Sequence, residues 1–131
     1  MGNPLPKTID IGTIGELLVQ LRLLEFGVQA APPIKDSGND LIAIKGEVCK
    51  YIQVKTTEGD RFNISRLPLI YHILALVKLE KEQDMISLDR SKIFLLKKSN
   101  INKKSYNCSE LKDSEINTSL INSIWLGKNY S

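Results

Sequence analysis

Cysteines and long apolar runs are scarce in this sequence, and each scarcity excludes a class of protein. The 131 residues hold two cysteines, Cys49 and Cys108, with neither a CxxC pair nor a neighbouring histidine, so a zinc site and a disulfide framework are unsupported. The longest apolar stretch, residues 67–79, is interrupted by proline, histidine and lysine and is shorter than the roughly 18 residues of a membrane span. The first residues lack the basic and apolar regions of a secretory signal. We therefore expect a cytoplasmic protein without a membrane span, whose thiols stay free.

Extremes of composition are absent as well. Apolar residues make up 42% and charged residues 25% of the sequence, close to the averages of soluble globular proteins. These fractions exclude a disordered tail and a collagen-like fibre. At roughly 100–200 residues per domain, the length predicts one domain over residues 1–131. We expect its core at about residues 10–90 and a basic C-terminal extension at about residues 90–131.

The net charge of +3 is distributed unevenly along the chain. Residues 1–65 carry seven basic and eight acidic side chains, whereas residues 66–131 carry eleven basic and seven acidic ones. The stretch 90–104 contains six basic residues and no acid. Such a stretch can hold a polyanion such as nucleic acid. The alternative is an ordinary solvated surface, in a chain that is rich in lysine, isoleucine and asparagine.

Apolar residues recur at helical spacing near the start of the chain and predict a helix over residues 13–26. Gly27 follows the last of these residues and suits a left-handed C-terminal cap. The predicted apolar face of this helix consists of Ile14, Leu17, Leu18, Leu21 and Leu24.

Strand patterns that alternate with helical ones indicate a mixed sheet covered by helices. An edge strand is predicted at 28–34, where two prolines fall, and two further strands at 40–45 and 48–56 pair as a hairpin. The nearly continuous apolar run at 72–79 predicts a buried central strand. The remaining predictions are a short helix at 66–71, a short strand at 85–88, a helix or strand at 91–98, and a final amphipathic helix at 114–126.

The predicted hairpin brings polar side chains to one edge of the sheet. Its tight turn at 46–47 places Asp40 beside Gln53 and Lys55, whose side chains share one face of their strand. Carboxylate and amide oxygens suit Mg²⁺, and the backbone carbonyl of Val54 could supply another oxygen. Lys55 could then position or help deprotonate the attacking water, or stabilise the charge that develops on a phosphate. This set predicts a metal site for phosphodiester hydrolysis.

Glu16 lies at the margin of the predicted apolar face of the first helix. From there it could reach the same site, directly or through a metal-bound water. The alternative is a structural role, because Thr13-Ile-Gly-Glu16 has the spacing of a capping box, in which the glutamate bonds back to the start of the helix.

Three segments of the chain resemble the PD-(D/E)xK nuclease superfamily. They are Gly15-Glu16-Leu-Leu-Val, Ser37-Gly38-Asn39-Asp40-Leu-Ile-Ala and Ile52-Gln53-Val54-Lys55-Thr56, and the resemblance covers residues 10–90. Within the superfamily, the chain is most similar to archaeal Holliday junction resolvases and group I intron-associated endonucleases. The resemblance implies an α/β, restriction-endonuclease-like fold with an αβββαβ core, in which helices flank a mixed central sheet. It also implies hydrolysis of DNA phosphodiester bonds with Mg²⁺, for which Mn²⁺ can substitute.

The resemblance also assigns roles to individual residues. Asp40 matches the metal-binding aspartate of the first motif, and Lys55 matches the catalytic lysine of the second. Glu16 matches a glutamate that many members carry on the first helix. Gln53 takes the place of an acidic residue, which removes one negative charge and lowers the expected metal affinity, although intron-associated members also carry glutamine here. Asn39 stands where the motif usually has proline. The implied catalytic set is Glu16, Asp40, Gln53 and Lys55, and the implied metal ligands are Asp40, Gln53, Glu16 and the Val54 carbonyl.

DNA is the expected partner. An enzyme that cuts both strands needs two sites, so we expect a symmetric homodimer. The stripe of Ile116, Leu120 and Ile124 on the last helix is one candidate for its interface, and core packing is the commoner use of such a stripe. By the resemblance, Ser37-Gly38 lies in a loop that faces DNA. The predicted DNA contacts are Lys35, Ser37, Arg61, Arg66, Lys92, Lys97 and Lys98.

The sequence therefore predicts a Mg²⁺-dependent DNA endonuclease, either structure-specific like a Holliday junction resolvase or of the intron or restriction type. Two other classes stay open. The first is a catalytically weakened DNA-binding or assembly module of the same fold, in which Gln53 marks the loss of metal binding. Binding of Mg²⁺ or Mn²⁺ that Asp40→Ala abolishes would exclude this module. The second is a protein-interaction domain, which would lack the salt-dependent DNA binding that phosphate contacts produce.

Overall fold

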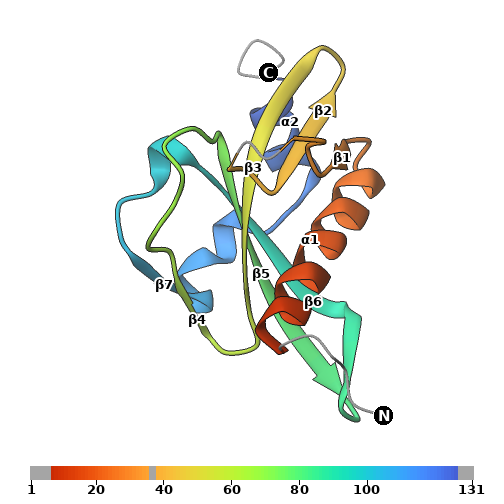
Figure 1. The fold of residues 1–131 in the computed structure, drawn as a ribbon, viewed down its shortest axis with the longest axis vertical. Coiled ribbons are helices and arrows are strands. Elements are labelled where there is room, and N and C mark those ends of the chain that lie inside the picture. The colour runs from red at the N-terminus through yellow and green to blue at the C-terminus, as the bar shows by residue number, and fades with distance from the viewer. Residues whose placement is uncertain (1–6, 36–37, 127–131) are drawn as a thin grey trace.

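A curled, mixed five-stranded sheet is the framework of the computed structural model, which describes residues 7–35 and 38–126. Its strands are β1 (Gln29–Ala31), β2 (Leu41–Lys45), β3 (Val48–Thr57), β5 (Ile73–Glu82) and β6 (Met85–Lys97). They lie in the order β1-β2-β3-β5-β6 (Figure 1). The central pair β3 and β5 is parallel, and the other neighbouring pairs are antiparallel. The predicted edge strand, hairpin and central strand are therefore confirmed.

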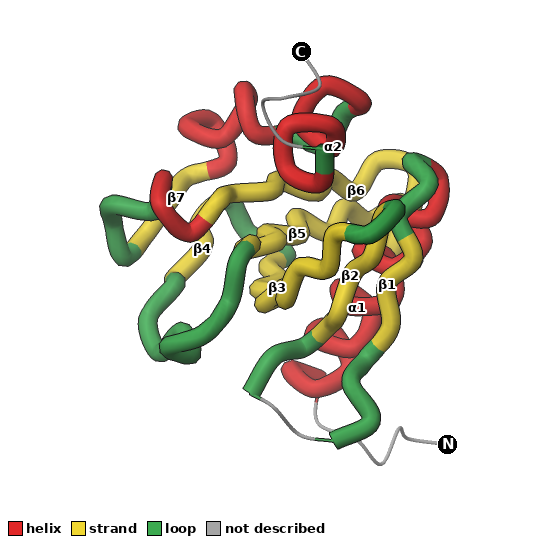
Figure 2. The backbone as a smooth tube through the Cα atoms, turned by 90° about the horizontal axis from the view of Figure 1, so that it is seen from above, coloured by secondary structure: helices red, strands yellow, loops and turns green. Residues whose placement is uncertain are grey.

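Different layers cover the two faces of this sheet. On one face, the helices α1 (Lys7–Glu25) and α2 (Thr118–Trp125) pack against the first core. On the other face, a two-stranded sheet of β4 (Arg61–Asn63) and β7 (Ser105–Asn107) packs against the second core. The 3-10 helix η2 (Cys108–Ser114) joins this second layer. Figure 2 shows β4 and β7 on one side of the central strands and α1 on the other. Over residues 7–35 and 38–126, none of the helices has the length and apolar character to cross a bilayer.

Both cores meet at β5, whose side chains alternate between them. Ile73, Ala75 and Val77 belong to the core beneath the helices, and Leu74 and Leu76 belong to the core beneath β4 and β7. A strand buried on both faces reads as a continuous apolar run, which is the pattern that predicts it. The helices contribute Leu18, Val19, Leu23, Ile121, Ile124 and Trp125 to the first core, and the second contains Phe62, Ile64, Tyr71, Tyr106 and Leu111.

The short helix predicted at 66–71 is wrong. The chain crosses from β3 to the parallel β5 through β4 and an irregular segment, and Arg66 has a φ of 65°. Pro68 accounts for the difference, because a proline disfavours helical backbone in the residue before it. Leu69 and Ile70 in this segment are exposed. The fold class is confirmed with this one connection changed.

Element boundaries also differ from the predictions. The first helix begins at Lys7 rather than 13, and residues 91–97 continue the strand that starts at Met85. The last helix begins at Thr118, where the Asn117 side chain accepts a hydrogen bond from the Leu120 N–H at 2.8 Å. This N-terminal cap separates α2 from the 3-10 helix before it. Cys49 and Cys108 are free thiols, as predicted.

The apolar face of α1 is the second correction. Leu18, Val19 and Leu23 are buried in the core, whereas three leucines of the predicted face turn outward. Their exposed fractions are 59% for Leu17, 44% for Leu21 and 60% for Leu24. The helix carries apolar residues around most of its circumference, so helical spacing alone does not select the face that packs.

Candidate active site

The hairpin of β2 and β3 brings the first two candidate residues to the same end of the sheet. Lys45 pairs with Val48 across the turn, and the register continues to Leu41 opposite Ile52. The regular pairing ends there, because the Asp40 N–H donates to the carbonyl of this same Ile52 at 3.2 Å. Asp40 therefore lies just before β2, next to the part of β3 that carries Gln53.

A backbone hydrogen bond fixes the Asp40 carboxylate. Its Oδ2 accepts the Val54 N–H at 2.8 Å, beyond the last residue of β2. The N–H and C=O of one strand residue point the same way, so the Val54 carbonyl is also directed toward the Asp40 side. Burial raises the pKa of Asp40, and the Val54 hydrogen bond and the charge of Lys55 offset part of that rise. Lys55 thus acts electrostatically on the carboxylate that β3 holds.

Helix α1 reaches this carboxylate through a close approach to β3. A Cβ atom added at Gly15 would lie 1.9 Å from the Thr56 Oγ1, so only glycine fits here. The next residue, Glu16, is half-buried, and burial followed by the charge of Asp40 raises its pKa. Since α1 begins at Lys7, Glu16 lies in the helix interior, which excludes the capping-box alternative.

Some side-chain oxygens on the segments that carry the candidate residues have no hydrogen-bond partner. In the described part of the chain, three buried side-chain atoms lack a hydrogen-bond partner, namely Asn39 Oδ1, Gln53 Oε1 and Thr56 Oγ1. Asn39 adjoins Asp40, and Thr56 faces Gly15. A buried polar atom without a partner is costly and needs an explanation. For Gln53, which adjoins the residue that holds the Asp40 carboxylate, a bound cation would be a partner for the amide oxygen.

The donor set fits a hard cation such as Mg²⁺, which binds oxygen ligands and retains several waters. Asp40 and Glu16 offer carboxylates, Gln53 offers an amide oxygen, and Val54 offers a carbonyl. Within residues 7–35 and 38–126, no group of three or more histidine, cysteine, aspartate or glutamate side chains is placed to hold a metal. An ion here would therefore depend on the amide and the carbonyl as well as on the two carboxylates.

A hollow of 380 Å³ lies beside these residues. Tyr51 and Ile42, which pair with each other, line it from the sheet, and Asn39, another of its lining residues, adjoins the candidate ligand Asp40. Loop residues Ile34, Lys35 and Ile70 complete its walls. Of the predicted DNA contacts, Lys35 therefore lines the hollow that Asn39, the neighbour of Asp40, also lines.

The other predicted DNA contacts are spread over the molecule. Arg61, on β4, is exposed and donates to the Ser105 hydroxyl at 3.2 Å, and Arg66 and Lys92 are exposed as well. Ser37 lies outside the described residues. Lys97 and Lys98 line a separate pocket together with Lys50 and His72, two residues that the sequence did not mark as DNA contacts. The sequence gives a sign of Lys50 alone, because this lysine interrupts the apolar face of its strand.

Comparisons with known proteins give one informative likeness. No family model matches the sequence, and no curated protein matches it. Among solved structures, the chain is similar to a bacterial homing endonuclease, I-Ssp6803I, with a TM-score of 0.56 and 14% sequence identity, over 81% of this chain and 75% of that chain. At this identity the likeness concerns the fold. It supports the mixed α/β, restriction-endonuclease-like fold that the sequence predicts.

Proposed function

We propose that this chain is a Mg²⁺-dependent DNA endonuclease of the PD-(D/E)xK type. The observation that carries the proposal is the Asp40 carboxylate, which the Val54 N–H holds at 2.8 Å between Gln53, whose buried oxygen has no partner, and Lys55, whose charge acts on that carboxylate. The fold of a bacterial homing endonuclease, to which this structure is similar, supports the same class. Junctions, as for a resolvase, and specific duplex sites, as for intron or restriction enzymes, are both candidate substrates.

Asp40, Gln53, Glu16 and the Val54 carbonyl would hold the ion. A bound Mg²⁺ or Mn²⁺ lowers the pKa of its water and neutralises charge on the scissile phosphate. The surroundings of both carboxylates favour a bound cation. Burial raises the pKa of Asp40, and burial together with the Asp40 charge raises the pKa of Glu16. Each carboxylate is thus held in surroundings where its own charge is unfavourable until a positive charge arrives.

Lys55 is the chain's own cation at the site. Its charge acts on Asp40, so its ammonium lies within electrostatic reach of the carboxylate. An ammonium at this place can orient the attacking water and stabilise the extra negative charge of the pentavalent phosphate. Lys55 shares a face of β3 with Gln53, so both side chains approach a phosphate from the same side.

A cleavage panel tests this proposal. A four-way junction, a flap, a single strand and a plasmid duplex are each incubated with Mg²⁺ or Mn²⁺ and either the wild-type chain or Lys55→Ala. We expect the wild-type chain to cut at least one substrate. This cutting should disappear without the metal and in Lys55→Ala, since the ion and the lysine both stabilise the transition state. Cutting that survives in Lys55→Ala would contradict the assignment of this lysine.

A catalytically weakened DNA-binding module is the second candidate. The absence of a three-carboxylate cluster in residues 7–35 and 38–126 favours it, because an amide binds a divalent ion less strongly than a carboxylate. The two candidates differ in metal binding. Calorimetric Mn²⁺ binding that Asp40→Ala abolishes supports the enzyme, and DNA binding without any metal binding supports the module.

A further inference from the structure

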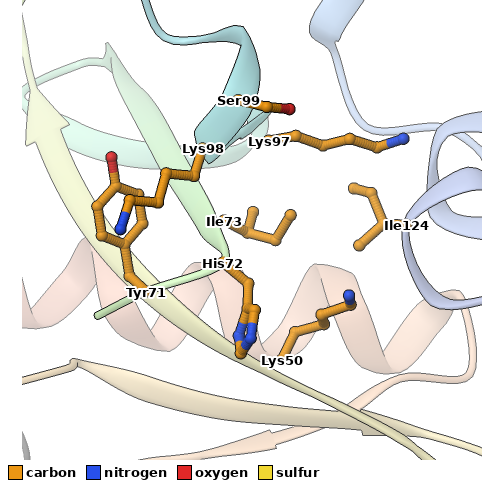
Figure 3. Close-up of a pocket in the computed structure, with 8 residues that line it drawn as sticks. All are labelled: Lys50, Tyr71, His72, Ile73, Lys97, Lys98, Ser99 and Ile124. Carbon is orange, nitrogen blue, oxygen red and sulfur yellow. The ribbon is translucent and has the colours of Figure 1, made fainter. Parts of the chain in front are cut away.

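A second pocket, of 430 Å³, lies where β5 begins and β6 ends, next to α2 (Figure 3). Three lysines line it, Lys50 from β3, Lys97 from the end of β6, and Lys98 from the short 3-10 helix η1 (Lys98–Asn100). His72 and Ser99 add further polar groups. None of the residues that line this pocket is acidic, so its polar side chains offer mainly hydrogen-bond donors and positive charge.

The lysines of the pocket differ in how they are held. The Lys98 ammonium donates to the Leu69 carbonyl at 2.5 Å and lies 4.8 Å from the centre of the Tyr71 ring. Lys50 and Lys97 have no ion pair or side-chain hydrogen bond with any described residue, and Figure 3 shows both extending toward Ile124. Two lysines without a charged partner among the described residues leave positive charge at this pocket that an anion would compensate.

His72 adds a neutral donor to this charge. Its Nδ1 accepts the Tyr51 N–H at 2.9 Å. Desolvation and the charges of Lys50 and Lys98 lower the pKa of His72, so the ring is neutral near pH 7 and carries its proton on Nε2. An imidazole in this form donates a hydrogen bond without adding to the repulsion among the lysines.

The pocket adjoins the hollow beside the candidate active site. Tyr51 lines that hollow and His72 lines this pocket, and the centres of their rings are 5.3 Å apart. The neighbouring loop residues Ile70 and Tyr71 line the hollow and the pocket respectively. A chain of nucleotides that leaves the candidate site through the hollow would therefore meet Lys50, His72 and Lys98 next.

We propose that this pocket binds a backbone phosphate of the DNA substrate through Lys50, Lys97, Lys98, His72 and Ser99. The choice of DNA as the ligand rests on the proposed function, whereas the location of the binding site rests on the geometry of the pocket. Phosphate suits the pocket because its oxygens accept hydrogen bonds from ammonium, imidazole and hydroxyl groups at once. The contact extends the DNA-binding surface beyond the residues around Asp40.

The test compares the salt dependence of DNA binding in the wild-type chain and in Lys50→Gln/Lys97→Gln. Fluorescence anisotropy with a labelled junction and a labelled duplex, in the absence of divalent ions, measures binding without cleavage. The slope of log affinity against log salt should fall by about 0.9 for the lost phosphate contact. Lys112→Gln is the matched control, because Lys112 is exposed and lines neither pocket, and it should leave the slope unchanged.

A second arm separates this inference from the proposed function. Inorganic phosphate is titrated into the wild-type chain and the double variant while NMR follows the ring of His72, the one histidine of the chain. A saturable shift that the double variant loses, together with the reduced salt slope, supports the site. If the wild-type chain binds and cuts DNA and the double variant keeps the wild-type slope, the pocket is overturned and the nuclease proposal is left intact. A phosphate-dependent shift without DNA binding overturns both the DNA assignment of the pocket and the nuclease proposal.

Discussion

At the scale of single residues, Gln53 decides what the candidate site can do. Its buried amide oxygen has no partner, and the next residue of β3, Val54, holds the Asp40 carboxylate in place. A glutamate there would add the negative charge that the PD-(D/E)xK pattern has at this position. The glutamine therefore lowers the charge of the site while it keeps an oxygen in place.

The variant Gln53→Glu should bind Mg²⁺ roughly tenfold more tightly, since about 1.4 kcal/mol of added charge interaction is a factor of ten. Without metal, the same variant should be less stable than the wild type, because a third carboxylate would join Glu16 and Asp40. Calorimetry measures the affinity, and thermal unfolding with and without Mn²⁺ measures the stability. Equal affinity in the two proteins would show that the amide oxygen does not face the ion.

The two carboxylates should make metal binding depend on pH. Both pKa values are raised above their usual 4.5 for Glu16 and 3.8 for Asp40. The folded chain therefore holds protons at pH values where the unfolded chain has lost them, and its stability without metal falls as pH rises through this window. Metal binding needs both carboxylates ionised, so it should strengthen over the same window.

Mn²⁺ affinity, followed by electron paramagnetic resonance, should thus weaken on acidification before pH reaches the ordinary carboxyl range. In Asp40→Asn, the pH dependence of stability in the metal-free chain should become flatter, since one of the two shifted groups is gone. An affinity that stays constant down to the ordinary carboxyl pKa values would refute the coupling of these residues to the metal.

At the scale of elements, the contact between α1 and β3 sets the geometry of the site. The helix can deliver Glu16 beside Asp40 because Gly15 lets its backbone approach Thr56. Threonine is stiff at χ1, so its Oγ1 does not move aside easily. The distance between the helix and the strand is therefore set by the missing side chain of Gly15 and the hydroxyl group of Thr56.

Gly15→Ala should push α1 away from β3, with a loss of roughly 1–3 kcal/mol in the free energy of unfolding and a loss of cleavage. Gly12→Ala is the matched control on the same helix, because nothing lies within 4 Å of a Cβ atom added there. That control should gain roughly 0.5–1 kcal/mol, as alanine favours a helix over glycine. Chemical denaturation measures both values, and equal effects of the two substitutions would rule out the close contact.

At the scale of the whole molecule, the sequence predicted those parts of the structure whose signals are local or continuous. The tight turn at 46–47 and the apolar run of β5 gave the hairpin and the central strand. Strands of three residues, such as β4 and β7, carry no usable periodicity, so the second sheet was missed. The basic pocket was missed because Lys50, His72 and Lys98 are far apart in sequence and meet only through the parallel pairing of β3 with β5.

For the candidate site, the sequence predicted the residues of the hairpin better than the contribution of α1. The register of the hairpin follows from its turn, so the meeting of the Asp40 end of the hairpin with the Gln53 part of β3 was within reach of the sequence. The reach of Glu16 was not, because it depends on how closely α1 approaches β3 at Gly15. The helix has apolar residues on several sides, so its packed face is set by the shape of the sheet.

The outward leucines of α1 lead to the last prediction, a homodimer. The stripe of Ile116, Leu120 and Ile124, the earlier candidate, packs against the core of the chain. Leu17, Leu21 and Leu24 follow one another at helical spacing on the exposed side of α1 instead. One chain offers one candidate active site, and cutting both strands of a duplex needs two. A symmetric pair of α1 helices would bury these leucines and supply the second site.

Sedimentation should show a dimer for the wild-type chain and a monomer for Leu17→Gln/Leu21→Gln/Leu24→Gln. The substitutions should leave the fold intact, because all three side chains are exposed in the single chain. Met85→Gln is the control, since Met85 is 74% exposed on another element and its loss should not affect the association. On a plasmid substrate, the monomeric variant should nick one strand where the dimer cuts both. A wild-type chain that sediments as a monomer at tens of micromolar would reject this interface, and double-strand cutting by that monomer would reject the need for a second site.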